Sequence, residues 1–215
     1  MFSLPINELY EIGFKDREIQ KVIAFGSIVA STFNNYSSEK LSTIIDLCSG
    51  NGLSSFAFQF NNLANKSLMI DIRKPKRFEK IKKLFEAYDF EYNYPIEDIN
   101  SEDFQLSNFC KLEKSAIVSI HPCSRLGDKV IDIALKSKIP FALMTCCHQI
   151  KRERYKLNNP PDSRLMLYDE SADYYDLVRQ RYIEEQGWNC YWKEISKKIT
   201  PKNHVLIGLK KDKKI

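Results

Sequence analysis

The stretch that decides the fold is "TIIDLCSGNGLSS", residues 43–55. An apolar run ends at Asp46 and is followed by the small thiol Cys48, by two glycines, Gly50 and Gly52, and by a second apolar run. A glycine-rich turn between a strand and a helix lets a ligand approach the backbone closely, because glycine carries no side chain. The stretch therefore predicts a strand, a ligand-binding turn and a helix.

The pattern continues on both sides of this turn, with short β-rich runs alternating with helical ones. This alternation predicts an α/β fold with a parallel sheet that has helices on both faces. The predicted strands are 41–48, 66–72, 90–98, 115–123, 140–148, 188–196 and 203–210. The predicted helices are 18–33, 53–64, 75–90, 126–138 and 172–186. The link between the last two strands, "KKITPK", is too short for a crossover helix, so these two strands should pair antiparallel.

Length and composition narrow the class of protein. The 215 residues, 43% of them hydrophobic, fit a single domain over 1–215, with 1–38 as an N-terminal helical segment packed on it. No apolar run reaches the ~18 residues of a membrane span, and the N-terminus lacks a signal-peptide pattern, so a cytoplasmic protein is expected. Six cysteines in a chain this long do not indicate a disulfide framework. The net charge of +5 permits an anionic partner such as RNA.

A second acid indicates what the turn binds. Asp71 ends the second predicted strand, and a carboxylate in that position can accept both hydroxyls of a ribose. The ligand should therefore be built on adenosine. A dinucleotide turn usually has a third glycine where the pyrophosphate meets the helix, and Ser55 stands there. A NAD-dependent oxidoreductase is accordingly the less favoured alternative.

The residues Asp46, Cys48, Gly50 and Gly52 match the acid and alternate small residues of the class I S-adenosylmethionine-dependent methyltransferases, which the chain resembles over nearly its whole length. The resemblance implies a Rossmann-like, seven-stranded, mostly parallel sheet with an antiparallel last strand. It also implies S-adenosylmethionine as cofactor. By position, the Gly50–Gly52 backbone should face the methionine part, with Asp46 supporting the turn. Further expected contacts are Asp71 with the ribose, Asp98 or its competitor Glu97 with the adenine amino group, Ile72 with the adenine face, and His121 near the reactive methyl.

Two further stretches, "SIHPCSRLGD" and "MTCCHQIKRERY", lie at the ends of neighbouring predicted strands. They resemble the branch of these enzymes that contains the tRNA acceptor-stem 2′-O-methyltransferase. The matching residues are His121, Cys123, Asp128, Cys146, Cys147 and His148. His121 or His148 can take a proton from a hydroxyl acceptor, and Asp128 can orient one of them. The alternatives are a polar wall that shapes the pocket and a zinc site. We expect no metal, because adjacent cysteines rarely bind one ion together.

Basic residues follow the Cys-Cys-His directly. Arg152 and Arg154 can bind phosphate and Tyr155 can stack on a base, with Arg125 on the same rim, although a solvated loop is an equal alternative. The predicted function is a methyltransferase that acts on RNA, with a tRNA 2′-hydroxyl favoured. The alternatives are transfer to a small molecule or a protein side chain, and a non-catalytic cofactor-binding subunit.

Overall fold

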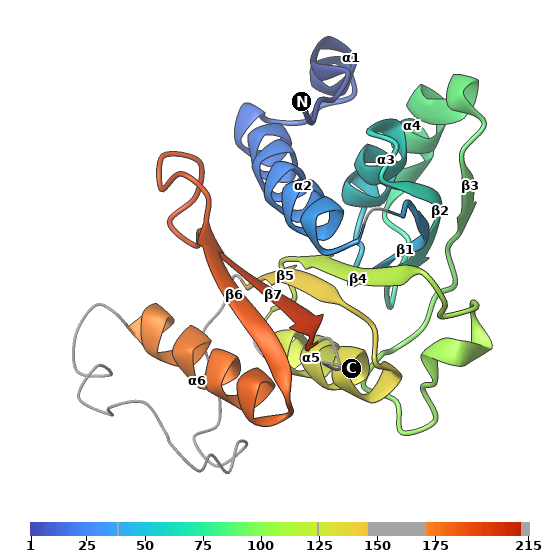
Figure 1. The fold of residues 1–215 in the computed structure, drawn as a ribbon. Coiled ribbons are helices and arrows are strands. Elements are labelled where there is room, and N and C mark those ends of the chain that lie inside the picture. Colours follow the sequence, from blue (N-terminus) through green and yellow to red (C-terminus); the bar gives the residue numbers. More distant parts are fainter. Residues whose placement is uncertain (38, 124, 146–170, 212–215) are drawn as a thin grey trace.

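The computed structural model describes residues 1–37, 39–123, 125–145 and 171–211. Within this part of the chain it has a seven-stranded sheet in the order β3-β2-β1-β4-β5-β7-β6 (Figure 1). The strands are β1 Leu41–Leu47, β2 Ala64–Ile70, β3 Glu91–Asn93, β4 Ser115–Ile120, β5 Phe141–Met144, β6 Trp188–Glu194 and β7 His204–Lys210. The predicted fold is confirmed.

Strand directions follow the sequence pattern. Strand β1 lies at the centre and pairs parallel with β2 and with β4, while β3 and β5 extend the parallel sheet on either side. Strand β7 pairs antiparallel with both β5 and β6. The short link between β6 and β7 allows no crossover, so β7 runs against its neighbours as predicted.

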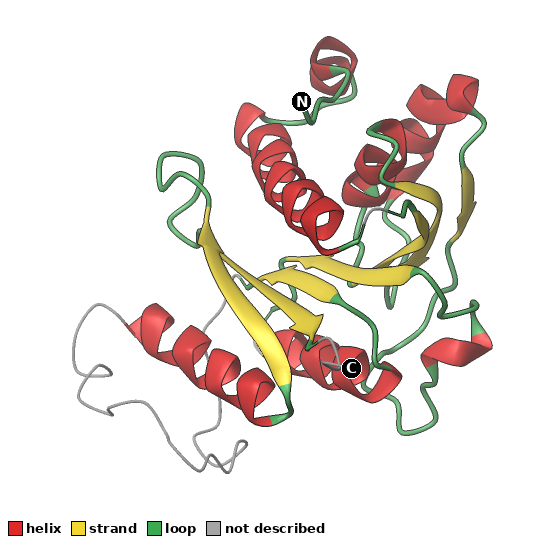
Figure 2. Cartoon of the chain, viewed as in Figure 1, coloured by secondary structure: helices red, strands yellow, loops and turns green. Residues whose placement is uncertain are grey.

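Helices cover both faces of the sheet (Figure 2). They are α1 Ile6–Glu11, α2 Asp16–Tyr36, α3 Leu53–Phe60, α4 Lys76–Phe85, α5 Arg125–Ser137 and α6 Ser171–Glu185, with short 3-10 turns at Glu86–Tyr88 and Leu106–Asn108. Successive strand residues alternate between the faces, so Ile44 joins the core under α2 to α4 and Ile45 the core under α5 and α6. Buried residues of α5 and α6 join the second core.

Several element boundaries differ from those predicted; for example, α4 ends at Phe85 rather than at 90, and β4 ends at Ile120 rather than at 123. Helix α3 ends at Phe60 rather than at 64, because Asn62 adopts a left-handed conformation that turns the chain into β2. Strand β3 covers only three residues of the predicted 90–98, and its extension past Tyr94 is a single bridge between Asp71 and Ile96. The later part of the predicted fifth strand lies outside the described residues.

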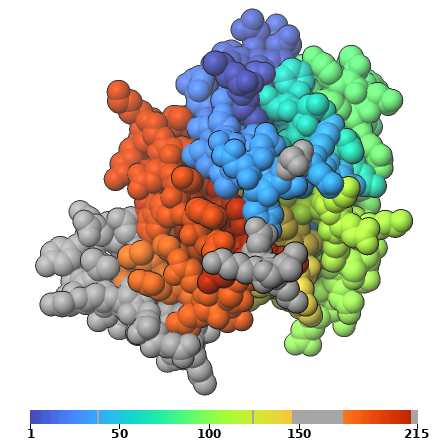
Figure 3. All heavy atoms as spheres, viewed as in Figure 1, coloured from blue at the N-terminus to red at the C-terminus, as the bar shows by residue number. Residues whose placement is uncertain are grey.

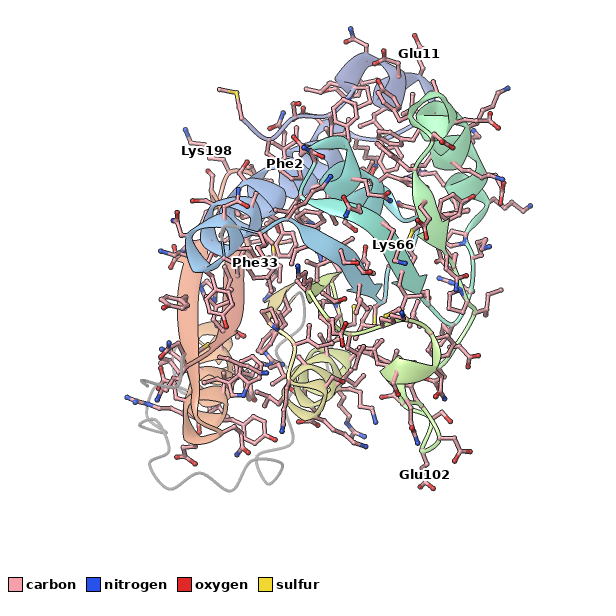
Figure 4. The ribbon with its side chains drawn as sticks, turned by 45° about the vertical axis from the view of Figure 1, so that its right-hand side comes forward. Phe2, Glu11, Phe33, Lys66, Glu102 and Lys198 are labelled. Carbon is pink, nitrogen blue, oxygen red and sulfur yellow. The ribbon has the colours of Figure 1, made fainter. Side chains whose placement is uncertain are left out.

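The N-terminal helices pack on the same face as α3, and the space-filling view shows α2 beside the β6–β7 part of the molecule (Figure 3). Phe2, which lies beside α2, packs its ring edge-on against Phe58 (Figure 4). A Cβ at Gly26 would lie 2.3 Å from the Phe2 ring, so only glycine allows this approach. No helix among the described residues is long and apolar enough to cross a membrane.

Candidate cofactor site and active site

The glycine turn after β1 has the conformation that its sequence requires. Gly50 and Gly52 have φ of 54° and 77°, in the left-handed region that side chains disfavour. A Cβ at Gly52 would lie 2.7 Å from Met69 Sδ, so this glycine allows close packing of α3 on β2. A Cβ at Gly50 would meet nothing within 4 Å. Gly50 therefore presents bare backbone to open space, while Gly52 serves the fold.

Asp46, near the end of β1, holds the first turn of α3 through hydrogen bonds. Its carboxylate Oδ2 accepts hydrogen bonds from the hydroxyls of Ser54, at 2.5 Å, and Ser55, at 2.8 Å, in the first turn of α3. Ser55 thus explains why the third glycine of a dinucleotide turn is absent. Burial raises the pKa of Asp46 to about 6, against the lowering effect of the two serines. Its other oxygen, Oδ1, is buried and has no hydrogen-bond partner among the described residues.

Asp71 closes the turn from the neighbouring strand. Its Oδ2 accepts a hydrogen bond from the Gly50 backbone N–H at 2.9 Å, and its backbone carbonyl accepts one from the Glu97 N–H at 3.0 Å. Ile72 is 66% exposed beside it. Glu97 and Asp98 are also exposed, and Asp98 Oδ1 accepts a hydrogen bond from the Asn100 N–H. The exposed side chains of Ile72, Glu97 and Asp98 leave this edge accessible to a ligand.

Cys48 lies near the carboxylates at this edge. Burial first, and then the nearby carboxylates of Asp71, Asp46 and Asp98, raise the pKa of the Cys48 thiol to about 12. The ends of β1, β2 and β3 therefore bring these three acids close together, as the sequence predicts for strands of one parallel sheet. The thiol remains protonated at neutral pH, so it is no nucleophile.

A cavity of about 330 Å³ opens on the other side of the glycine turn. Its walls come from three places: the start of α2, the turn itself and the end of β4. The lining includes Phe14, Glu18, Lys21, Gly50, Ile120 and His121. Sequence reasoning assigned α2 to packing and missed its part in the site. The signal was present, because Glu18 and Lys21 lie on the same side of α2 as the buried residues Ile19, Val22 and Phe25.

His121 follows β4 directly, with a left-handed φ of 71°, and its backbone N–H donates to the carbonyl of Met144 at the end of β5. Its Nε2 lies 2.7 Å from Lys21 Nζ. Burial, and then the charge of Lys21, lower the pKa of His121 to about 4. An ammonium group offers only donors, so Nε2 accepts this bond and the ring proton sits on Nδ1. His121 is therefore a neutral imidazole at physiological pH.

Asp128 has partners other than the predicted ones. It lies on α5, is completely buried, and accepts a hydrogen bond from Arg179 Nε of α6 at 2.9 Å. Arg179 also pairs with Asp176, which accepts hydrogen bonds from Thr145 and lies 2.9 Å from His204 Nδ1. These contacts place Asp128 in a buried ionic network between α5 and α6. Its predicted role in orienting a histidine stays a prediction, because His148, one of the two candidate histidines, lies outside the described residues.

The remaining predicted residues divide into two groups. Arg125 begins α5 and is exposed, as is Cys123 at the end of the β4–α5 loop. His148, Arg152, Arg154 and Tyr155 lie outside the described residues, as do Cys146 and Cys147. Among the described residues, no three histidine, cysteine, aspartate or glutamate side chains are grouped in a way that could hold a metal ion.

The cofactor turn, the acid after β2 and the strand order together are typical of a methyltransferase. Residues 15–153 match a protein family described as a methyltransferase domain. The chain belongs to this family. The methyltransferase uses S-adenosylmethionine. The residues present fit that cofactor, because Gly50 offers open backbone and the Asp71 carboxylate lies at the end of β2 beside it.

Solved structures with the same fold include methyltransferases for different substrates. One is a magnesium protoporphyrin IX methyltransferase from Synechocystis with bound S-adenosylhomocysteine (10% identity, TM-score 0.56), where the match covers 98% of this chain and 96% of the other. A second is a putative RNA methyltransferase from Pyrococcus horikoshii (13% identity, TM-score 0.54), where the match covers 100% of this chain and 92% of the other. A third is a tRNA methyltransferase from B. subtilis (11%, 0.52), where 87% of this chain covers 66% of that one.

At these identities the likeness shows the fold alone. Comparison with curated proteins found no match in sequence. The substrate of this methyltransferase therefore has to be argued from its own residues.

Proposed function

We propose that this methyltransferase transfers the methyl group of S-adenosylmethionine to RNA, with a tRNA 2′-hydroxyl as the favoured acceptor. The observation that carries the proposal is the size and position of the cavity. About 330 Å³ lies at the small end of the range for pockets that enclose one small molecule. If the amino-acid end of the cofactor occupies this cavity, the acceptor has to approach from the outer edge of the sheet. An approach from outside suits a large substrate.

The described part of that edge carries basic side chains. Arg73 and Lys74 follow β2 and are exposed, and Arg125 is exposed at the start of α5. Lys74 Nζ lies 4.8 Å from the centre of the Tyr94 ring, which holds the ammonium group near the mouth of the turn. Lysine and arginine side chains supply the salt-dependent part of nucleic-acid affinity by contacting phosphates. Arg152, Arg154 and Tyr155 would extend this basic edge beyond the described residues.

His121 is our candidate for proton transfer. When bound, the cofactor supplies an electrophilic methyl group, and its carbon–sulfur bond breaks as the new bond to the acceptor oxygen forms. The acceptor hydroxyl loses its proton in this reaction, and the lone pair of the neutral His121 Nε2 can take it. In the structure that lone pair accepts a hydrogen bond from Lys21. Proton transfer therefore requires that Lys21 first give up this bond.

The experiment incubates the purified chain with methyl-labelled S-adenosylmethionine and separated cell RNA, protein and metabolite pools. We expect label in RNA, recovered as alkali-resistant dinucleotides, because a 2′-O-methyl group blocks attack on the next phosphate. Label in protein or metabolites would refute an RNA acceptor. Label in the mononucleotides that alkali releases would refute the 2′-hydroxyl as the acceptor.

Two variants assign the roles within this reaction. Asp71→Ala should lose cofactor binding and transfer together. His121→Ala should slow transfer by about 10²–10⁴-fold while its affinity for S-adenosylhomocysteine changes much less. Transfer by His121→Ala at the parent rate would remove His121 from the mechanism.

A further inference from the structure

We infer that Lys21 of helix α2 binds the carboxylate at the amino-acid end of the cofactor and in doing so leaves His121 Nε2 available as an acceptor. The inference rests on the proposed function only for the proton-transfer role of His121. The binding role of Lys21 stands independently, because it concerns a cofactor that the family already requires.

The sheet order sets the direction in which the cofactor lies. Asp71 and Asp98 follow β2 and β3, on one side of the central strand β1, while His121 follows β4 on the other side. A carboxylate after the second strand suits a ribose, which places the adenosine part over β2 and β3. The amino-acid end must then cross Gly50 toward β4 and α2. The cavity between α2 and the turn lies on that side.

The cavity is lined by one acidic side chain, Glu18, and by the basic side chain of Lys21, which could contact the amino group and the carboxylate of an amino acid. Glu18 already has partners: it accepts a hydrogen bond from the Lys15 backbone N–H at 2.9 Å and pairs with Arg77 at 3.2 Å. Lys21 is half-buried, and in this structure its ammonium donates to the neutral ring of His121. A hydrogen bond between an ammonium and a carboxylate is stronger than one between an ammonium and a neutral acceptor. A carboxylate that enters the cavity would therefore compete well for Lys21.

The same contact couples cofactor binding to the candidate base. While Lys21 donates to Nε2, the imidazole cannot accept a proton there, and the positive charge at 2.7 Å opposes protonation. When Lys21 turns to a carboxylate, Nε2 becomes available and the nearby positive charge is neutralised. The pKa of His121 should then rise above about 4, although burial, the larger cause, still holds it below its ordinary value. A base that becomes competent only in the loaded site would follow when Lys21 exchanges His121 for the carboxylate of the cofactor.

Binding affinity tests the carboxylate contact without any turnover. Calorimetry compares S-adenosylhomocysteine with the analogue that lacks only its carboxylate, using the parent chain, Lys21→Met and Lys82→Met. Lys82 makes the matched control because it is exposed on α4 and does not line the cavity. We expect Lys21→Met to bind S-adenosylhomocysteine about 10- to 100-fold more weakly and the analogue nearly unchanged, whereas Lys82→Met behaves as the parent.

Two calorimetric results would overturn the inference. One is an equal loss of affinity for both ligands in Lys21→Met, and the other is no loss for either. A parent chain that binds neither ligand would refute the cofactor itself, and the proposed function with it. Cofactor binding together with failure to methylate RNA would refute only the proposed function.

A second readout follows His121 directly. The chain has three histidines, so NMR titration can assign the His121 ring by comparison with His121→Gln. We expect the ring to stay neutral down to about pH 4 in the free chain and to titrate at higher pH in Lys21→Met and in the complex with S-adenosylhomocysteine. A His121 titration that does not change on ligand binding would overturn the coupling between Lys21 and the base.

Discussion

At the scale of single residues, two glycines separated by one residue have different tasks. Gly50 has open space where a side chain would begin, and it lines the cavity. Gly52 has Met69 and the Phe78 ring where its side chain would begin. Both have a left-handed φ, so the backbone strain of a substitution is similar at the two positions. Their surroundings differ, and this predicts different consequences of the same mutation.

Gly50→Ala should weaken binding of S-adenosylhomocysteine more than it affects folding. The left-handed conformation costs about 1–2 kcal/mol of stability with alanine, and the added methyl group enters the space that the ligand needs. Gly52→Ala serves as the matched comparison: it adds a contact of 2.7 Å with Met69 Sδ and should lower stability further, by about 1–3 kcal/mol. Urea unfolding and calorimetry of both variants measure the two effects. Equal stability losses would contradict the assignment of separate tasks.

At the scale of elements, α6 is joined to the sheet by a buried ionic network. Arg179 lies between Asp128 of α5 and Asp176 of its own helix, and all three side chains are fully buried. Asp176 continues the network to Thr145, just after β5, and to His204 at the start of β7. Thr145 immediately precedes the Cys-Cys-His stretch. The network therefore connects α5, α6 and the start of β7 with the residue that follows β5.

Arg179→Leu should destabilise the chain by about 3–5 kcal/mol, because it leaves two buried carboxylates without their shared cation. Arg181→Leu, two positions along the same helix, is the control. Arg181 pairs with Glu184 at the surface, with 56% of its side chain exposed, and its loss should change stability by less than about 1 kcal/mol. Chemical denaturation measures both values. A loss of less than about 1 kcal/mol for Arg179→Leu would contradict a stabilising network.

At the scale of the whole molecule, the candidate functional groups within the described residues lie at one edge of the sheet. The turn after β1, Asp71 after β2 and His121 after β4 all lie at the carboxyl ends of parallel strands, where this architecture places its ligands. Arg73, Lys74 and Arg125 follow strands at the same edge. Lys40 and Lys210 lie at the opposite edge, because Lys40 precedes β1 and β7 runs antiparallel. The two edges provide an internal comparison for RNA binding.

Binding to bulk tRNA should weaken as the salt concentration rises. A plot of the logarithm of the association constant against the logarithm of the salt concentration should have a slope of about −0.7 to −0.9 for each phosphate contacted. The double variant Arg73→Gln/Lys74→Gln should reduce the magnitude of this slope by about 1–2 if both residues contact phosphates. Lys40→Gln/Lys210→Gln removes the same charge from the opposite edge and should leave the slope nearly unchanged. Filter binding across a salt series measures both. Equal reductions would show that the net charge, and not the proposed edge, attracts the RNA.

The sequence by itself determined the elements and their order. Short β-rich runs mark the strands, the pair Gly50 and Gly52 marks the turn, and the short link before β7 requires antiparallel pairing. These features are local, because hydrophobic periodicity and backbone conformation depend on residues close together in the chain. The position of Asp71 beside the turn followed from the same local patterns, because neighbouring parallel strands end at one edge.

Only the tertiary structure decided which distant side chains meet. Lys21 and His121 are separated by 100 positions, and a lysine among helical residues gives no sign of its partner. Packing of α6 on α5 likewise pairs Asp128 with Arg179, 51 positions away, and no pattern in the sequence indicated this pair. Charged side chains pair with whatever the packed elements bring within a few ångströms, and burial then strengthens the pairing. That choice depends on the docking of helices on the sheet, which no local pattern encodes.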